Sequence, residues 1–161
     1  MPKPFDPSHA KRFICLVLFF DAMGVGLILP VMPELIRELS DRPVEDAARI
    51  GGYLLLCFAG MQFLCAPLLG ALSDRFGRRP VLLLALLGFS ADYFLMAMAP
   101  TLGWLFAARL VSGIFGATYP AATAAMADIS SPGQRAGDFG LVGASIGLGF
   151  VVGPAFGGLL G

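Results

Sequence analysis

The sequence predicts an all-α membrane protein with about five transmembrane helices. Hydrophobic residues make up 57% of the 161 residues and charged residues only 14%, whereas a soluble domain carries roughly 25% charged residues. The mean hydropathy is +0.81. The apolar residues are also grouped in runs of about 20, the length that crosses a hydrocarbon core of roughly 30 Å. The formal net charge of +0 gives no indication of nucleic-acid binding.

Five apolar runs are expected to span the membrane, at residues 13–35, 50–72, 80–99, 102–127 and 139–161. The first run is too long for a signal peptide, carries Asp21, and is followed by further spans. Cys15, Cys57 and Cys65 lie inside these runs without metal-ligand spacing. We interpret them as small buried hydrophobic residues, and a disulfide or a reactive thiol is the alternative interpretation.

The basic residues predict a cytoplasmic N-terminus, because cytoplasmic loops of membrane proteins are enriched in Lys and Arg. With that orientation, only three basic loop residues face the outside: Arg37, Arg42 and Arg49. The cytoplasmic side then carries Lys3, Lys11, Arg12, Arg75, Arg78, Arg79 and Arg135. Five spans place the C-terminus outside.

The turn between the second and third runs has the sequence GALSDRFGRR at residues 70–79. Gly70 is expected to let two backbones approach closely, and Gly77 to supply the permissive backbone of a tight turn. Pro80 suits the first turn of the following helix. Asp74 is an anion that a helix N-terminus could hold. The alternative is a solvated loop whose arginines only set the topology.

This turn resembles the signature loop between the second and third helices of the major facilitator superfamily of secondary transporters. The resemblance implies that Asp74, Arg75, Arg78 and Arg79 take part in a cytoplasmic gate against the second half of such a transporter. It also implies a facilitator-type N-terminal domain over residues 1–161, part of a six-helix bundle. The sixth helix and the C-terminal half would lie outside this chain.

Three ionisable residues lie inside the predicted spans, where a charge is costly unless it meets a partner or a wet cavity. At about 1.5 Å per residue, Asp21 lies about 13 Å and Asp92 about 18 Å from the cytoplasmic edge. Arg109 lies about 10 Å from the outer edge, so its depth is similar to that of Asp92 and an ion pair is feasible. All three are candidates for proton coupling. The alternatives are structural pairs for the aspartates and an Arg109 that snorkels to the outer interface.

Two further segments extend the resemblance. LFAARLVSGIFGA resembles the family's fourth-helix pattern of an arginine followed by spaced glycines, which implies a role for Arg109 in proton coupling. GFVVGPAFGG resembles the fifth-helix motif of proton antiporters in the superfamily. The residues of this motif are Gly149, Gly153, Pro154, Gly157 and Gly158.

Glycines spaced four apart share one helix face and permit close approach of another helix. Pro154 removes a backbone donor and can kink the span. Because further helices of such a transporter would lie outside this chain, we expect the glycine face to lack its packing partner. A generic glycine-rich packing face is the alternative to an antiporter motif.

The narrowest resemblance is to tetracycline/proton antiporters, because FDAMGVGLILPVMPEL, ADYFLMAMAP and ARLVSGIFGAT occur in the same order with the motifs above. It implies the N-terminal half of a bacterial inner-membrane exporter that exchanges protons for tetracycline or a related drug by alternating access. Tyr119, Pro120 and the apolar AATAAMADIS depart from the pattern and leave other drugs or metabolites as substrates.

The sequence predicts no enzyme, no metal site and no cofactor besides the proton gradient. His9 is the single histidine and lies near the N-terminus without an evident partner. A divalent metal would enter only as part of a drug chelate. The expected partners are the drug, protons, the lipid bilayer and the missing C-terminal half. The alternative is a truncated, non-transporting membrane protein with a structural or interaction role; a small channel is weaker, because one Arg and two Asp form no selectivity ring without oligomerisation.

Overall fold

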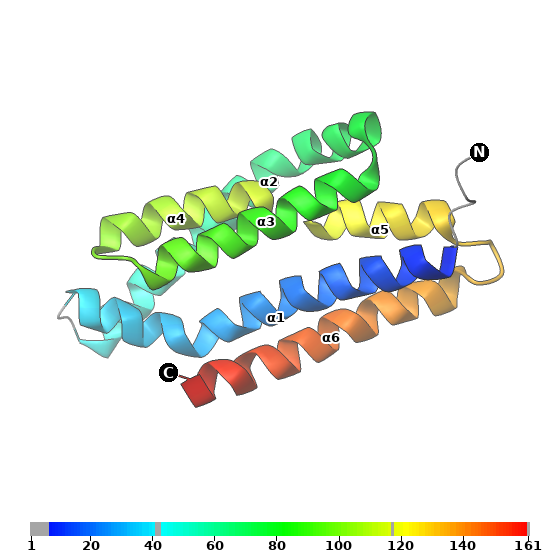
Figure 1. Ribbon diagram of the computed structural model, residues 1–161. Coiled ribbons are helices and arrows are strands. Elements are labelled where there is room, and N and C mark those ends of the chain that lie inside the picture. Colours follow the sequence, from blue (N-terminus) through cyan, green and yellow to red (C-terminus); the bar gives the residue numbers. More distant parts are fainter. Residues whose placement is uncertain (1–6, 41–42, 117, 161) are drawn as a thin grey trace.

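The protein is a bundle of six helices, with no strand in the part of the chain that the structure describes (Figure 1). The computed structural model describes residues 7–40, 43–116 and 118–160. The helices are α1 (Pro7–Ser40), α2 (Val44–Phe76), α3 (Arg78–Ala97), α4 (Leu102–Phe115), α5 (Thr118–Ile129) and α6 (Arg135–Leu160). Five helical segments are long and apolar enough to cross a membrane. The predicted all-α membrane protein is therefore confirmed.

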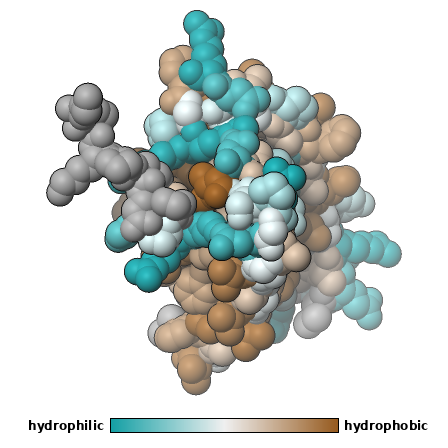
Figure 2. Space-filling view, turned by 90° about the vertical axis from the view of Figure 1, so that its right-hand side faces the viewer, coloured by the Kyte–Doolittle hydropathy of each residue, from teal (hydrophilic) through white to brown (hydrophobic). Residues whose placement is uncertain are grey.

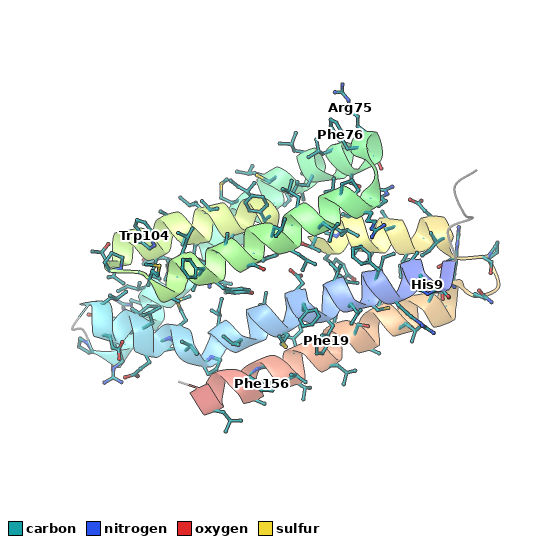
Figure 3. The ribbon with its side chains drawn as sticks, in the orientation of Figure 1. His9, Phe19, Arg75, Phe76, Trp104 and Phe156 are labelled. Carbon is teal, nitrogen blue, oxygen red and sulfur yellow. The ribbon has the colours of Figure 1, made fainter. Side chains whose placement is uncertain are left out.

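The two ends of the bundle differ in charge. The start of α1, the α2–α3 turn and the start of α6 lie together at what we call the basic end (Figure 1). Figure 2 views this end and shows hydrophilic residues gathered across it. In Figure 3, Arg75 and His9 lie toward the basic end, whereas Trp104 lies at the opposite end. Lys3 and Arg42, which contribute to the predicted charge bias, lie outside the described residues.

His9 corrects one expectation. It lies in the first turn of α1, and it has an interaction partner, contrary to the expectation.

The predicted fourth span corresponds to one candidate membrane span, Leu102–Ile129, within which the structure describes two helices, α4 and α5. Pro120 lies in the first turn of α5, and a proline inside a helix lacks the N–H donor and clashes with the carbonyl four residues earlier. Pro120 therefore cannot donate to the Gly116 carbonyl four residues earlier. The Gly116 N–H donates to the Gly113 carbonyl over 3.3 Å, and the Gln62 side chain of α2 donates to the Gly116 carbonyl. The carbonyl that Pro120 leaves without its helical donor thus receives a donor from α2.

The helices α1 and α6 run side by side in the same direction (Figure 1) and are joined along the glycine face of α6. A Cβ on Gly149 would lie 2.9 Å from the backbone nitrogen of Met23. Gly153 and Gly157 lie against the α1 backbone in the same way, near Met23 and Leu27. The contacting glycines are four residues apart on α6, and the α1 residues that they contact, Met23 and Leu27, are also four residues apart. This match is expected for two parallel helices in contact.

The expectation that this glycine face lacks a partner is therefore wrong, because α1 of the same chain fills that place. Gly158 is not part of the contact, since a Cβ there would meet no atom within 4 Å. The ring of Pro154 lies against Gly26, and α6 continues through this proline. At the basic end, an ion pair of 2.7 Å between Lys11 Nζ and Asp138 Oδ2 joins the same two helices.

Two large apolar clusters fill most of the bundle, and a small third one pairs Leu69 with Val81. The cluster nearer the basic end contains Ile14, Val17, Leu18, Leu82, Ala121, Ala122, Ala125, Met126 and Val142. The cluster nearer the other end contains Met32, Ile36, Ala47, Leu54, Met96, Leu105 and Ala108. Along α1, Asp21 lies between the two clusters; Asp92 does so along α3, and Arg109 lies at the edge of the second cluster. A polar layer therefore separates the two halves of the core.

The α2–α3 turn depends on Gly77, which adopts φ 95° and ψ 152°. A side chain is strained in this conformation, so Gly77→Ala is expected to lower the stability of the chain by about 1–3 kcal/mol. The measurement is the thermal unfolding midpoint in detergent. Gly70→Ala is the matched control, because a Cβ at Gly70 meets no atom within 4 Å. An equal loss of stability in both variants would contradict this account of the turn.

Candidate functional site

The polar layer is formed by side chains that three helices turn inward. Asp92 of α3 is 1% exposed, and Arg109 of α4 is 9% exposed. Phe89 and Met96 are also buried and lie three residues before and four residues after Asp92. This spacing places all three on one helix face, so the packing of α3 directs the carboxylate into the core.

Asp92 and Arg109 do not form a direct ion pair: among the described residues, no Arg109 nitrogen lies within 4.0 Å of an Asp92 oxygen. The Arg109 Nη2 atom instead donates to the Met96 sulfur over 3.1 Å. Its guanidinium carbon lies 5.9 Å from the centre of the Phe58 ring. The two charges still interact electrostatically. The ion pair that the sequence makes feasible therefore does not form. Asp92 and Arg109 instead lie in the same buried layer without direct contact.

The carboxylates of this layer have few direct partners. Both side-chain oxygens of Asp92 and the Oδ1 atom of Asp21 are buried without a hydrogen-bond partner among the residues described. Ser112 lies beside Asp92, and its hydroxyl donates to the Arg109 carbonyl over 3.2 Å. Because a buried carboxylate interacts very differently when it is protonated, such groups can couple proton exchange to helix packing.

Arg109 also borders an apolar cavity of about 260 Å³. The walls of this cavity include Ile28 and Met32 of α1 and Leu54 and Phe58 of α2. A cavity with apolar walls and one fixed polar group is typical of small-molecule sites. It lies on the side of the polar layer away from the basic end, because its α1 residues belong to the second half of that helix.

Arg78 makes polar contacts with three side chains at the predicted gate loop. Its guanidinium lies 2.8 Å from Asp74 Oδ1 and 3.1 Å from Asp128 Oδ2. It also donates to the Ser73 hydroxyl over 2.7 Å. Arg78 of α3 is thereby tied to both α2 and α5. Asp128 lies inside the AATAAMADIS segment, which was interpreted as apolar. Only the position of Asp128 near the end of a span could have suggested this contact.

The other loop residues have different surroundings. The guanidinium of Arg75 lies 5.5 Å from the centre of the Phe76 ring, and that of Arg79 lies 5.8 Å from the centre of the Phe13 ring. The close approach expected at Gly70 is wrong within the described residues, because a Cβ there would meet open space. A gate formed by this loop remains a prediction.

The helices and motifs of this chain match those of a known protein family. The family model described as Major Facilitator Superfamily matches residues 14–161. The chain belongs to the major facilitator superfamily. The structure agrees: the human organic anion transporter MFSD10 (TETRAN) superposes with a TM-score of 0.82 at 28% identity, over 98% of this chain and 43% of that chain.

Tetracycline resistance proteins are among the curated relatives of this facilitator-family chain. The class C protein of Escherichia coli is 54% identical over 154 residues, which are 96% of this chain and 38% of that protein. Multidrug resistance protein 1 of Bacillus subtilis is 37% identical over 144 residues, 89% of this chain and 36% of that protein. The chain therefore spans well under half the length of the relatives that it matches.

Proposed function

We propose that this chain is the N-terminal part of a proton-coupled exporter of tetracycline or a related drug in a bacterial inner membrane. The observation that supports the proposal most strongly is the polar layer formed by the half-buried Asp21 and the buried Asp92 and Arg109. A chain that is 54% identical to a tetracycline resistance protein keeps three ionisable residues in the interior of its spans, at a substantial energetic cost.

In this proposal the drug occupies a midplane site between two halves that rock against each other. The apolar cavity beside Arg109 supplies part of the drug contact from this half. Proton exchange at Asp21 or Asp92 changes the charge opposite Arg109, and the packing of α1, α3 and α4 responds. The loop at the basic end that carries Asp74, Arg75, Arg78 and Arg79 serves as the cytoplasmic gate. Any divalent metal travels with the drug.

Transport then requires the second half, and residues 1–161 alone are proposed to be inactive. To test both statements, residues 1–161 are joined to the part of the class C relative that follows the aligned region; we call this the joined protein. Proteoliposomes with an acidic interior should accumulate tetracycline when they hold the joined protein but not when they hold residues 1–161 alone. An ionophore that removes the pH gradient should abolish the accumulation.

Two outcomes would reject the proposal. One is a correctly inserted joined protein that accumulates no tetracycline. The other is accumulation that the ionophore leaves unchanged. Uptake by residues 1–161 alone would reject only the need for a second half.

The proposed orientation places the basic end in the cytoplasm. Phe76, which is 62% exposed at this end, and Glu38, which is exposed at the other end, are changed singly to Cys after the native cysteines are replaced by Ala. In intact cells, a membrane-impermeant maleimide should label Glu38→Cys only, and permeabilised cells should show labelling of both variants. Labelling of Phe76→Cys in intact cells would reverse the orientation.

A further inference from the structure

Tyr93 of α3 is the one aromatic hydroxyl that reaches the polar layer. Its ring stacks on Phe89, with ring centres 6.2 Å apart and planes 20° apart. Its hydroxyl side lies directly against the backbone of Gly24 on α1, because a Cβ on Gly24 would collide with the Tyr93 hydroxyl oxygen and the ring atoms beside it. The lack of a side chain at Gly24 therefore lets the phenol cross from α3 to α1.

The place that Tyr93 reaches is rich in carboxylates. Asp21 lies three residues before Gly24, so both share one face of α1. Asp92 is the residue directly before Tyr93. The charged groups that act electrostatically on Tyr93 are Asp21 from α1, Asp92 from α3 and Arg109 from α4; among the described residues, α2, α5 and α6 contribute none. The buried oxygens of both aspartates lack hydrogen-bond partners in the same set of residues.

We propose that Tyr93 is a positioning residue that links Asp21 to the Asp92 and Arg109 part of the polar layer. This inference deepens the proposed proton coupling and rests on it. In this structure the Asp21 Oδ1 atom has no hydrogen-bond partner among the described residues. A phenolic hydroxyl both donates and accepts, so in the proposed link the Tyr93 hydroxyl forms a hydrogen bond to Asp21 when the carboxylate ionises and releases it, or accepts from the carboxyl group, when Asp21 is protonated. Tyr93 keeps its own proton, and the exchanged proton passes between the aspartate and water.

This role of Tyr93 predicts that a change in the protonation of Asp21 on α1 also affects Asp92 on α3. When Asp21 changes its protonation, the hydroxyl reorients, and the field at Asp92 changes with it. The proton state of α1 is thereby communicated to α3 and α4 without direct contact between the aspartates. A phenylalanine at position 93 would keep the ring on Phe89 and the contact with Gly24 but lose the communication.

The test follows the carboxyl groups of the 161-residue chain in lipid nanodiscs by infrared spectroscopy during a pH titration. An Asp92→Asn background leaves Asp21 as the carboxyl of the layer. Tyr93→Phe should raise the half-titration pH of Asp21 by about one unit, because the charged form loses a hydrogen-bond donor. Tyr119→Phe, at a tyrosine that is 51% exposed, is the matched control and should leave the titration unchanged.

A second variant tests the geometry rather than the hydroxyl. Gly24→Ala should displace the phenol and shift the titration in the same direction, whereas Gly52→Ala should not, since a Cβ at Gly52 meets no atom within 4 Å. An unshifted titration in Tyr93→Phe would overturn the proposal. A shift in Tyr93→Phe that Gly24→Ala does not reproduce would overturn the route through Gly24.

The same variants separate this inference from the proposed function. In the joined protein, Tyr93→Phe should shift the pH profile of tetracycline accumulation while Tyr119→Phe leaves it in place. If accumulation depends on the proton gradient but its pH profile is the same in Tyr93→Phe, the proposed role of Tyr93 is wrong and the proposed transport function stands. If the carboxyl titration shifts but no proton-driven accumulation occurs, the link stands and the proposed function is wrong.

Discussion

Replacing Asp92 with Asn in the joined protein is expected to lower proton-driven tetracycline accumulation by roughly tenfold or more. The carboxylate is 1% exposed and its oxygens have no hydrogen-bond partner among the residues that the structure describes. An amide of nearly the same shape preserves the packing of the α3 face that carries Phe89, Asp92 and Met96. It cannot exchange a proton, so the response of Arg109 to protonation is lost.

Arg109→Ala should cause a comparable loss for a complementary reason, because it removes the cation that faces the carboxylates. Two exposed residues at the other end of the bundle supply matched controls. Glu38→Gln and Arg49→Ala remove the same charges there and should leave accumulation unchanged. The measurement is the initial rate of accumulation at equal amounts of inserted protein. Near-normal rates in both Asp92→Asn and Arg109→Ala would reduce these residues to packing roles.

Gly153→Ala is expected to separate α1 from α6 and to destabilise the chain by about 2 kcal/mol or more, as overpacking of a close interface does. The added Cβ would collide with the carbonyl oxygen of Met23 and lie 2.9 Å from the nitrogen of Leu27. These are backbone atoms, so neither can move aside as a flexible side chain would. The two helices must therefore shift apart.

Gly143→Ala is the matched control on the same helix, because a Cβ at Gly143 meets no atom within 4 Å. Alanine is the better helix former, so this variant should be neutral or slightly more stable. The thermal unfolding midpoint in detergent distinguishes the two substitutions. If Gly143→Ala and Gly153→Ala unfold at the same temperature, the glycine face of α6 does not hold α1.

Sequence patterns predicted the number of spans because length and hydropathy are local properties. They also predicted the special backbone of Gly77, since a tight turn beside Pro80 needs a residue without a side chain. They predicted the fourth span as a whole, but they did not predict that Gln62 of α2 donates to the Gly116 carbonyl within it. Pro120 marks this carbonyl in the sequence, because proline lacks the backbone N–H that would otherwise donate to it.

The partners of predicted residues were harder to infer. Helical rise gives the depth of Asp92 and Arg109 in a membrane, but contact also depends on how each helix is rotated about its axis. The similar depth therefore did not become a direct ion pair. For the same reason, the spacing of Gly149 and Gly153 shows a face for close packing but not that α1 fills it. The contact between Arg78 and Asp128 joins residues 50 positions apart, and no local pattern shows that pairing.

The most direct test of the central claim reverses the direction of coupling. Proteoliposomes of the joined protein are loaded with tetracycline, diluted into drug-free buffer of the same pH, and followed with a pH-sensitive dye in the lumen. Exchange through the buried layer predicts that the lumen becomes acidic as the drug leaves, and that Asp92→Asn shows no such acidification. Drug efflux at the normal rate with an unchanged luminal pH would contradict the account.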